Sequence, residues 1–87
     1  SNNNIGLAIR SGARTLKTLE KDQILKGVVK NVCQFGVFID CGVETSGLVH
    51  KSTFKGEPHQ IASAGQSRTV KVGKIDLDKN RLELFFV

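Results

Sequence analysis

The chain has 87 residues and a net charge of +5, with 13 Lys and Arg against 8 Asp and Glu. This length allows a single domain with one modest core and excludes a two-lobed enzyme cleft. No apolar run approaches the roughly 20 residues that a transmembrane helix needs, and no apolar segment marks a signal peptide. The basic balance favours a polyanionic partner such as nucleic acid. We therefore expect an intracellular protein, of the cytoplasm or the nucleus, that does not enter a membrane.

Residues 1–18 are predicted to form an N-terminal arm or linker, because Gly6, Ser11 and Gly12 interrupt any helix there. A short helical turn is expected near Thr15–Leu19. Leu16 and Leu19 are three residues apart, a spacing that would let both side chains pin this segment onto the body of the domain. Residues 19–87 are predicted to form that domain.

The pattern changes to strands from Ile24 onward. Three strands are predicted, over Ile24–Val32, Phe35–Cys41 and Gly47–His50. Along the second, Val37, Ile39 and Cys41 share the apolar face, and the residues between them share the other. Gly27 lies inside the first strand, which suggests a bend or bulge there.

Residues 51–65 break the strand pattern and are predicted to form a loop with one or two helical turns around Pro58. A fourth strand is predicted over Ser67–Leu77, with Val70 and Val72 pointing inward, and a fifth over Arg81–Phe86. The residues between them, Asp78-Lys79-Asn80, are typical of a turn. Five strands with a short helical insert between the third and fourth indicate an all-β fold, a five-stranded Greek-key barrel of the OB type.

Two phenylalanines and a histidine lie close together in this basic, strand-forming region. Phe38 shares a face with Gly36 and Asp40, which favours a surface position, whereas simple alternation would bury Phe35 with the next core residues. A ring that stays on the surface beside lysines is suited to stacking on a nucleic-acid base. Of the lysines on or beside the sheet, we select Lys30 and Lys71 as candidates to attract the phosphate backbone.

Several separated segments resemble the S1-type RNA-binding domain. They are Gly27–Val32, Phe35–Asp40, Gly47–Ser52, Gly65-Gln66 and Val70–Val72 with Ile75-Asp76. The resemblance runs from about Leu19 to Leu84. The segment Leu19–Gly27 and the run Asp40–Val43 are most similar to the C-terminal S1 domain of Tex-type transcription accessory proteins. One departure from the family is the apolar chain end, Leu84-Phe85-Phe86-Val87, where a serine and a basic residue are usual.

The resemblance implies an OB barrel and an RNA-facing surface made of Phe35, Phe38, His50, Asp76 and Arg81. It also turns Phe35 outward, which a bulge before Gly36 would achieve. Asp76 would either hold Arg81 by a charge-assisted pair or accept from a base amino group. Arg81 would stack on a base or bind a phosphate.

No enzyme, cofactor or metal site is expected. Cys33, Cys41, His50 and His59 contain no close Cys or His pair of the kind that zinc sites use. We therefore expect a non-catalytic module that binds single-stranded RNA with little sequence preference, with single-stranded DNA as a possible competitor. It would act in a larger protein of RNA metabolism or transcription and be a monomer when isolated. The alternative is a protein-interaction module that docks through Phe85, Phe86 and Val87.

Overall fold

The structure is a computed structural model that describes residues 15–87. Its elements are η1 (Leu16–Thr18), β1 (Ile24–Cys33), β2 (Gly36–Asp40), β3 (Gly47–His50), η2 (Lys51–Thr53), α2 (Pro58–Ile61), β4 (Ser67–Asp76) and β5 (Arg81–Phe86). The predicted five strands are confirmed, and β3 has the predicted limits. The arm's residues 1–14 lie outside the described part of the chain.

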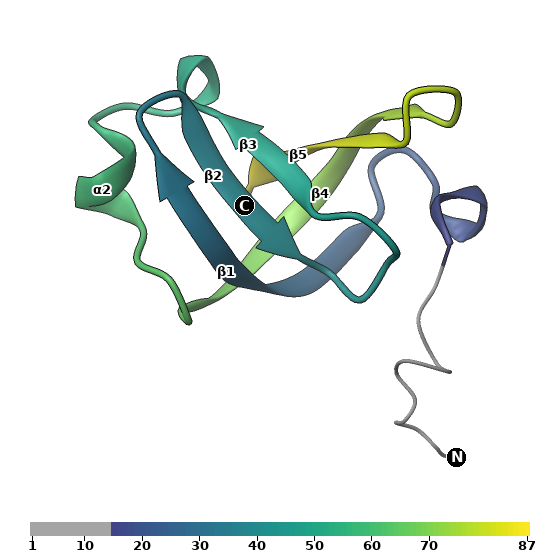
Figure 1. Cartoon of the computed structure of the whole chain (residues 1–87), viewed down its shortest axis with the longest axis horizontal. Coiled ribbons are helices and arrows are strands. Elements are labelled where there is room, and N and C mark those ends of the chain that lie inside the picture. The colour runs from purple at the N-terminus through teal and green to yellow at the C-terminus, as the bar shows by residue number, and fades with distance from the viewer. Residues whose placement is uncertain (1–14) are drawn as a thin grey trace.

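The five strands close into a barrel in the order β1-β2-β3-β5-β4, with β4 pairing back onto β1 (Figure 1). All neighbours are antiparallel except β3 and β5, which run parallel where Leu48 faces Glu83. This strand order is that of the OB barrel, so the predicted fold class is confirmed. The insert between β3 and β4 holds the short helices η2 and α2, as predicted.

The core fills the inside of the barrel and is made of every second residue along the strands. Seven of its side chains are at most 1% exposed: Val29, Val37, Ile39, Val49, Val70, Val72 and Leu84. Aliphatic side chains on alternate strand positions are what a half-buried sheet requires. The prediction that Val70 and Val72 point inward is therefore confirmed.

The segment before β1 is packed onto this core. Leu16 and Leu19 are 2% and 6% exposed, so the predicted pinning of this segment is confirmed. The backbone N–H of Leu16 donates to Glu44 Oε1 at 2.7 Å, which ties η1 to the β2–β3 loop. The predicted boundary between the arm and the domain, at residues 18 and 19, stays a prediction. Contacts with the barrel core begin before it, at Leu16.

β1 is long because it pairs with two neighbours, with β4 over residues 24–28 and with β2 over residues 28–33. The register with β2 shifts between Val29 and Asn31, so the bulge lies at Lys30 and not at Gly27. Gly27 serves close packing instead. A Cβ atom there would lie 2.5 Å from Ile39 Cγ2, so β1 and β2 could not approach as they do.

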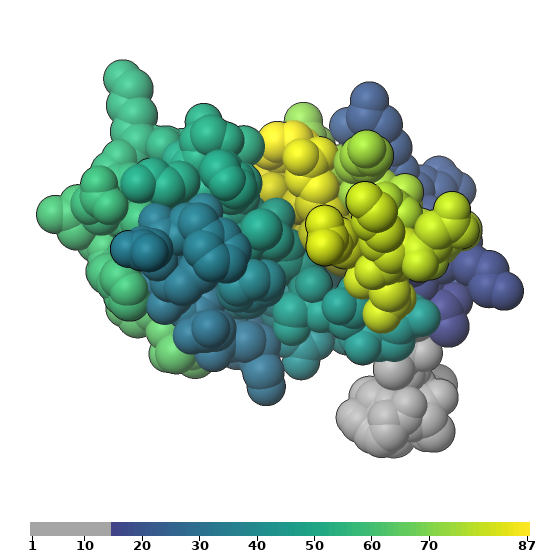
Figure 2. All heavy atoms as spheres, turned by 45° about the horizontal axis from the view of Figure 1, so that its top comes forward, coloured from purple at the N-terminus to yellow at the C-terminus, as the bar shows by residue number. Residues whose placement is uncertain are grey.

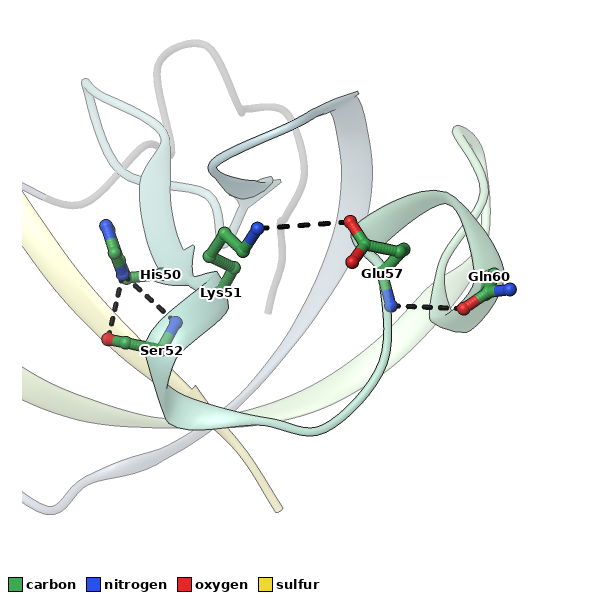
Figure 3. A network of polar contacts seen from close by, with 5 residues as sticks. All are labelled: His50, Lys51, Ser52, Glu57 and Gln60. Atoms are coloured by element: carbon green, nitrogen blue, oxygen red, sulfur yellow. Dashed lines mark hydrogen bonds and ion pairs between the residues drawn. The ribbon is translucent and has the colours of Figure 1, made fainter.

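The insert is fixed by its own polar contacts. Pro58 is buried at the first position of α2, where a missing N–H costs nothing. The Glu57 N–H donates to Gln60 Oε1 at 3.1 Å, and Lys51 Nζ lies 3.9 Å from Glu57 Oε1 (Figure 3). η2 follows β3 directly, so that His50 is both the last residue of β3 and the N-cap of η2.

Candidate nucleic-acid interface

Phe35 and Phe38 form an aromatic pair at the end of the β1–β2 hairpin. Phe35 is 47% exposed, and Phe38 is half-buried on the outer side of β2. Their ring centroids are 5.9 Å apart with an interplanar angle of 87°, an edge-to-face contact. Each ring therefore supports the other while leaving aromatic surface open.

The outward position of Phe35 has a different cause from the expected bulge before Gly36. Cys33 pairs directly with Gly36, so Gln34 and Phe35 are the two residues of the hairpin turn. Because Phe35 is outside both strands, the alternation that would bury it does not apply. The turn, and not a bulge, directs the ring to solvent.

β3 continues the same outer face beside the rings. Phe38 lies opposite Leu48, and Gly36 lies opposite His50. Gly36 has no side chain, so Leu48 packs over it. The surface therefore runs from the Phe35 ring in the turn and the Phe38 ring on β2 to a half-buried leucine and an exposed histidine on β3.

The His50 ring is oriented by the residues that follow it. The backbone N–H of Ser52 donates to His50 Nδ1 at 3.1 Å, and Ser52 Oγ lies 2.8 Å from the same nitrogen. A backbone N–H can only donate, so Nδ1 is the acceptor and the neutral ring carries its proton on Nε2. Figure 3 shows Nε2 turned away from Ser52, where it can donate to a ligand.

Asp76 and Arg81 face each other across the β4–β5 hairpin, at the end of one strand and the start of the next. Asp76 Oδ1 accepts from the Lys79 N–H at 3.0 Å and so stabilises the turn. Within residues 15–87 no ion pair joins Asp76 to Arg81. Arg81 is exposed, and Figure 2 shows the β1–β2 turn in blue at the left and the β4–β5 turn in yellow-green at the right of the same face of the molecule.

The two candidate lysines lie in different places. Lys30 is the extra residue of the β1 bulge, next to the Asn31–Phe38 pair, and is exposed. Lys71 lies on β4 opposite Phe85 of β5, so it does not adjoin the two rings. The structure thus groups Phe35, Phe38, His50 and Lys30 and separates Lys71 from them.

Three residues of this face were missed from the sequence. Leu48 and Asn31 flank Phe38 on either side, and Ser52 orients His50. Leu48 had a usable signal, because alternation with the inward Val49 places it outside. The contact of Ser52 depends on the turn after β3, which has no comparable pattern.

The apolar chain end is only partly available for docking. The Phe86 ring packs 5.7 Å from the Phe54 ring, and the Arg68 guanidinium carbon lies 4.0 Å from the Phe86 centroid. Val87 is 75% exposed, whereas Phe85 points to the outer side of β5. The predicted patch of Phe85, Phe86 and Val87 is therefore not one continuous surface.

Neither cysteine has the surroundings of a nucleophile. Burial, with a smaller contribution from the charge of Asp40, raises the pKa of the Cys41 thiol to about 11. The Cys33 thiol donates to the Gly36 carbonyl oxygen at 3.6 Å.

Within residues 15–87 no three His, Cys, Asp or Glu side chains gather as metal ligands. No helix in this range is long and apolar enough to cross a membrane.

Comparison with family models identifies the S1 RNA-binding domain over residues 18–85. The chain belongs to the S1 RNA-binding domain family. The match covers all five strands apart from the last residue of β5, and it includes the hairpins that carry Phe35, Phe38 and Arg81. The resemblance seen in the sequence is thereby confirmed.

The relatives of this S1 domain include the Tex proteins. It is 42% identical over 77 residues to the Escherichia coli protein YhgF, covering 84% of this chain and 10% of that protein. It is 40% identical over 79 residues to protein tex of Bordetella pertussis, covering 86% and 10% respectively. It is also 37% identical over 73 residues to ribosomal protein bS1 of Mycobacterium tuberculosis, covering 79% and 15%. The chain thus spans about a tenth of the Tex relatives' length.

Solved structures agree on the fold. GSP13 from Bacillus subtilis superposes with a TM-score of 0.72 at 29% identity, over 79% of this chain and 56% of that one. A Pyrococcus horikoshii chain, from a complex described as a/eIF2alpha-aDim2p-rRNA, superposes with a TM-score of 0.71 at 19% identity, over 78% and 44%. The second likeness shows the fold alone.

Proposed function

We propose that this S1 domain binds single-stranded RNA by stacking bases on Phe35, Phe38 and His50. The observation that carries the proposal is the Phe35–Phe38 pair, an exposed and a half-buried ring in contact on a domain with a net charge of +5. Every base has a face that can stack, so this mode of binding has little sequence preference. The His50 Nε2–H supplies a donor at the edge of the rings.

Charged groups around the rings would complete the site. Lys30 adjoins Phe38, and Arg81 projects from the β4–β5 hairpin with its guanidinium unpaired among the described residues. Both would attract phosphates, and Arg81 could also stack on a base. Asp76, whose Oδ1 already accepts from Lys79, would act by holding the turn that carries Arg81.

We further propose that the domain is a non-catalytic module of a larger intracellular protein of transcription or RNA metabolism. The relatives that support this are named as a transcriptional accessory protein and a ribosomal subunit protein, and the chain spans 10% and 15% of their length. A single barrel would bind weakly as a monomer and gain affinity from its tethered neighbours. Single-stranded DNA would compete, since stacking does not need the 2′-hydroxyl.

The test compares the unsubstituted 87-residue chain with its Phe38→Ala and His50→Ala variants. The affinity of each for fluorescent oligouridylate is measured at low and at moderate salt. Loss of one stacked base should weaken binding about 5- to 150-fold, which corresponds to 1–3 kcal/mol. Val87→Ala is the control, because it removes an exposed apolar side chain outside the proposed site. An affinity that Phe38→Ala leaves unchanged, in a folded variant, would exclude stacking at this face.

A further inference from the structure

A second surface lies on the β4–β5 side of the barrel, away from the aromatic pair. A groove of about 750 Å³ runs between the Lys21-Asp22 turn and the outer faces of β4 and β5. Phe85 and Ile75 give it apolar surface, and three lysines line it, namely Lys21, Lys71 and Lys74. The groove therefore combines an aromatic ring with a net positive charge of one, from three lysines against the carboxylates of Asp22 and Glu83.

The aromatic side of the groove is built by the strand register. Phe85 lies on β5 opposite Lys71 of β4, and it is half-buried. Its ring packs over Gly73, where a Cβ atom would come within 2.5 Å of Phe85 Cε2. A larger residue at position 73 would displace the ring, so Gly73 allows Phe85 to lie close to the sheet.

The opposite wall is held by backbone hydrogen bonds. The Asp22 N–H donates to the Val72 carbonyl at 2.7 Å, and the Val72 N–H donates to the Gln23 carbonyl at 2.8 Å. The buried Leu19 anchors the chain just before this turn. Lys21 is thus attached to a fixed backbone beside β4, and the groove does not depend on a mobile loop.

The charges in the groove are suited to an anion. Two carboxylates, those of Asp22 and Glu83, face the three lysines, which leaves a positive excess of one charge. Glu83 Oε1 accepts from the backbone N–H of Lys74 at 3.0 Å, which holds this carboxylate against β4. Within residues 15–87 no ion pair engages any of the three lysine side chains. Lysine charges beside an aromatic ring are the groups with which proteins bind phosphates and stack a base.

We propose that this groove is a second contact for single-stranded nucleic acid, with a base against Phe85 and phosphates at Lys21, Lys71 and Lys74. The inference rests on the proposed function, which it extends to a strand long enough to touch both surfaces. β3 alone separates β2 from β5 in the barrel order, so one strand of nucleic acid can pass across β3 from the aromatic pair to the groove. Lys71 then acts in the groove and not beside Phe38.

The experiment compares a four-nucleotide and a twelve-nucleotide oligouridylate, rU4 and rU12, on the 87-residue chain. Lys71→Ala/Lys74→Ala removes two groove charges, and Lys26→Ala/Lys55→Ala removes two exposed charges that do not line the groove. The groove variant should bind rU12 about tenfold more weakly than this control. Its slope of log affinity against log salt should be shallower by about 1.4, which is two contacts at 0.7 each. Binding of rU4 should differ less than twofold between them.

Phe38→Ala separates this inference from the proposed function. If Phe38→Ala weakens rU12 binding but the groove variant matches its control, the groove is not a contact and the proposed function stands. If the groove variant weakens rU12 binding and Phe38→Ala does not, the groove stands and the aromatic site fails. A hexaglutamate peptide that shifts the Phe85 and Lys74 amide resonances, where rU12 does not, would overturn the inference in favour of a protein partner.

Discussion

The substitution Leu16→Ala, which shortens a buried side chain, tests whether the segment before β1 belongs to the folded domain. Leu16 is 2% exposed and packs with the barrel core, although it precedes the first strand by eight residues in the chain. Leu-to-Ala changes at buried sites cost about 2–5 kcal/mol. Because η1 is only three residues long, it can relax into part of the cavity, so we expect about 2–3 kcal/mol for Leu16→Ala.

The assay is urea and thermal unfolding followed by circular dichroism. At 4–8 °C per kcal/mol for a domain of this size, the midpoint of Leu16→Ala should fall by about 10–20 °C. The urea m-value should not change. Lys17→Ala is the matched control, since Lys17 is the exposed neighbour in the same turn and its loss should change stability by less than about 0.5 kcal/mol. Equal stability of the two variants would refute the packing of Leu16 and place the domain boundary at residue 19.

Three further predictions concern packing, thiol chemistry and charge. Gly27→Ala should lose about 1–3 kcal/mol in urea unfolding, because its Cβ would meet Ile39 Cγ2, and undiminished stability would contradict that close approach. In Cys33→Ser, native Cys41 should react with iodoacetamide at pH 8 about 100-fold more slowly than in the unfolded chain, because its pKa is raised from 9.0 to about 11. The same pKa shift should lower the free energy of unfolding as pH rises above about 9, because the thiol of the unfolded chain loses its proton first. Equal alkylation rates in the native and the unfolded chain would contradict the raised pKa of Cys41. Lys30→Ala should make the slope of log RNA affinity against log salt shallower by about 0.7, because one phosphate contact is lost. The control Lys55→Ala should leave this slope unchanged, and equal slopes in the two variants would show that Lys30 does not contact phosphate.

Most of the fold follows from patterns within single segments. Alternation predicted β3 with its observed limits and placed Val37, Ile39, Val70 and Val72 inward, because one buried face imposes a period of two on the sequence. The bulge was the exception. Gly27 was the residue that suggested it, but the register shifts at Lys30, and that shift depends on how β1 divides its pairing between two partners.

The candidate site was less predictable because it depends on contacts between distant segments. Phe38 could be placed outside from its neighbours, whereas the position of Phe35 depends on a two-residue turn. Nothing local showed that Lys71 lies beside Phe85, because their pairing exists only after β4 and β5 come together. The hydrogen bonds of Asp76 and His50 are likewise set by the turns that follow them.

The central claim, that Phe35, Phe38 and His50 form a stacking surface for RNA, is tested most directly by an amide NMR titration with short unstructured RNA at low and moderate salt. The account predicts shifts that cluster at Phe35, Phe38, His50, Lys30 and Arg81 and fade as salt rises. Shifts confined to other parts of the barrel, or none at saturating RNA, would contradict it.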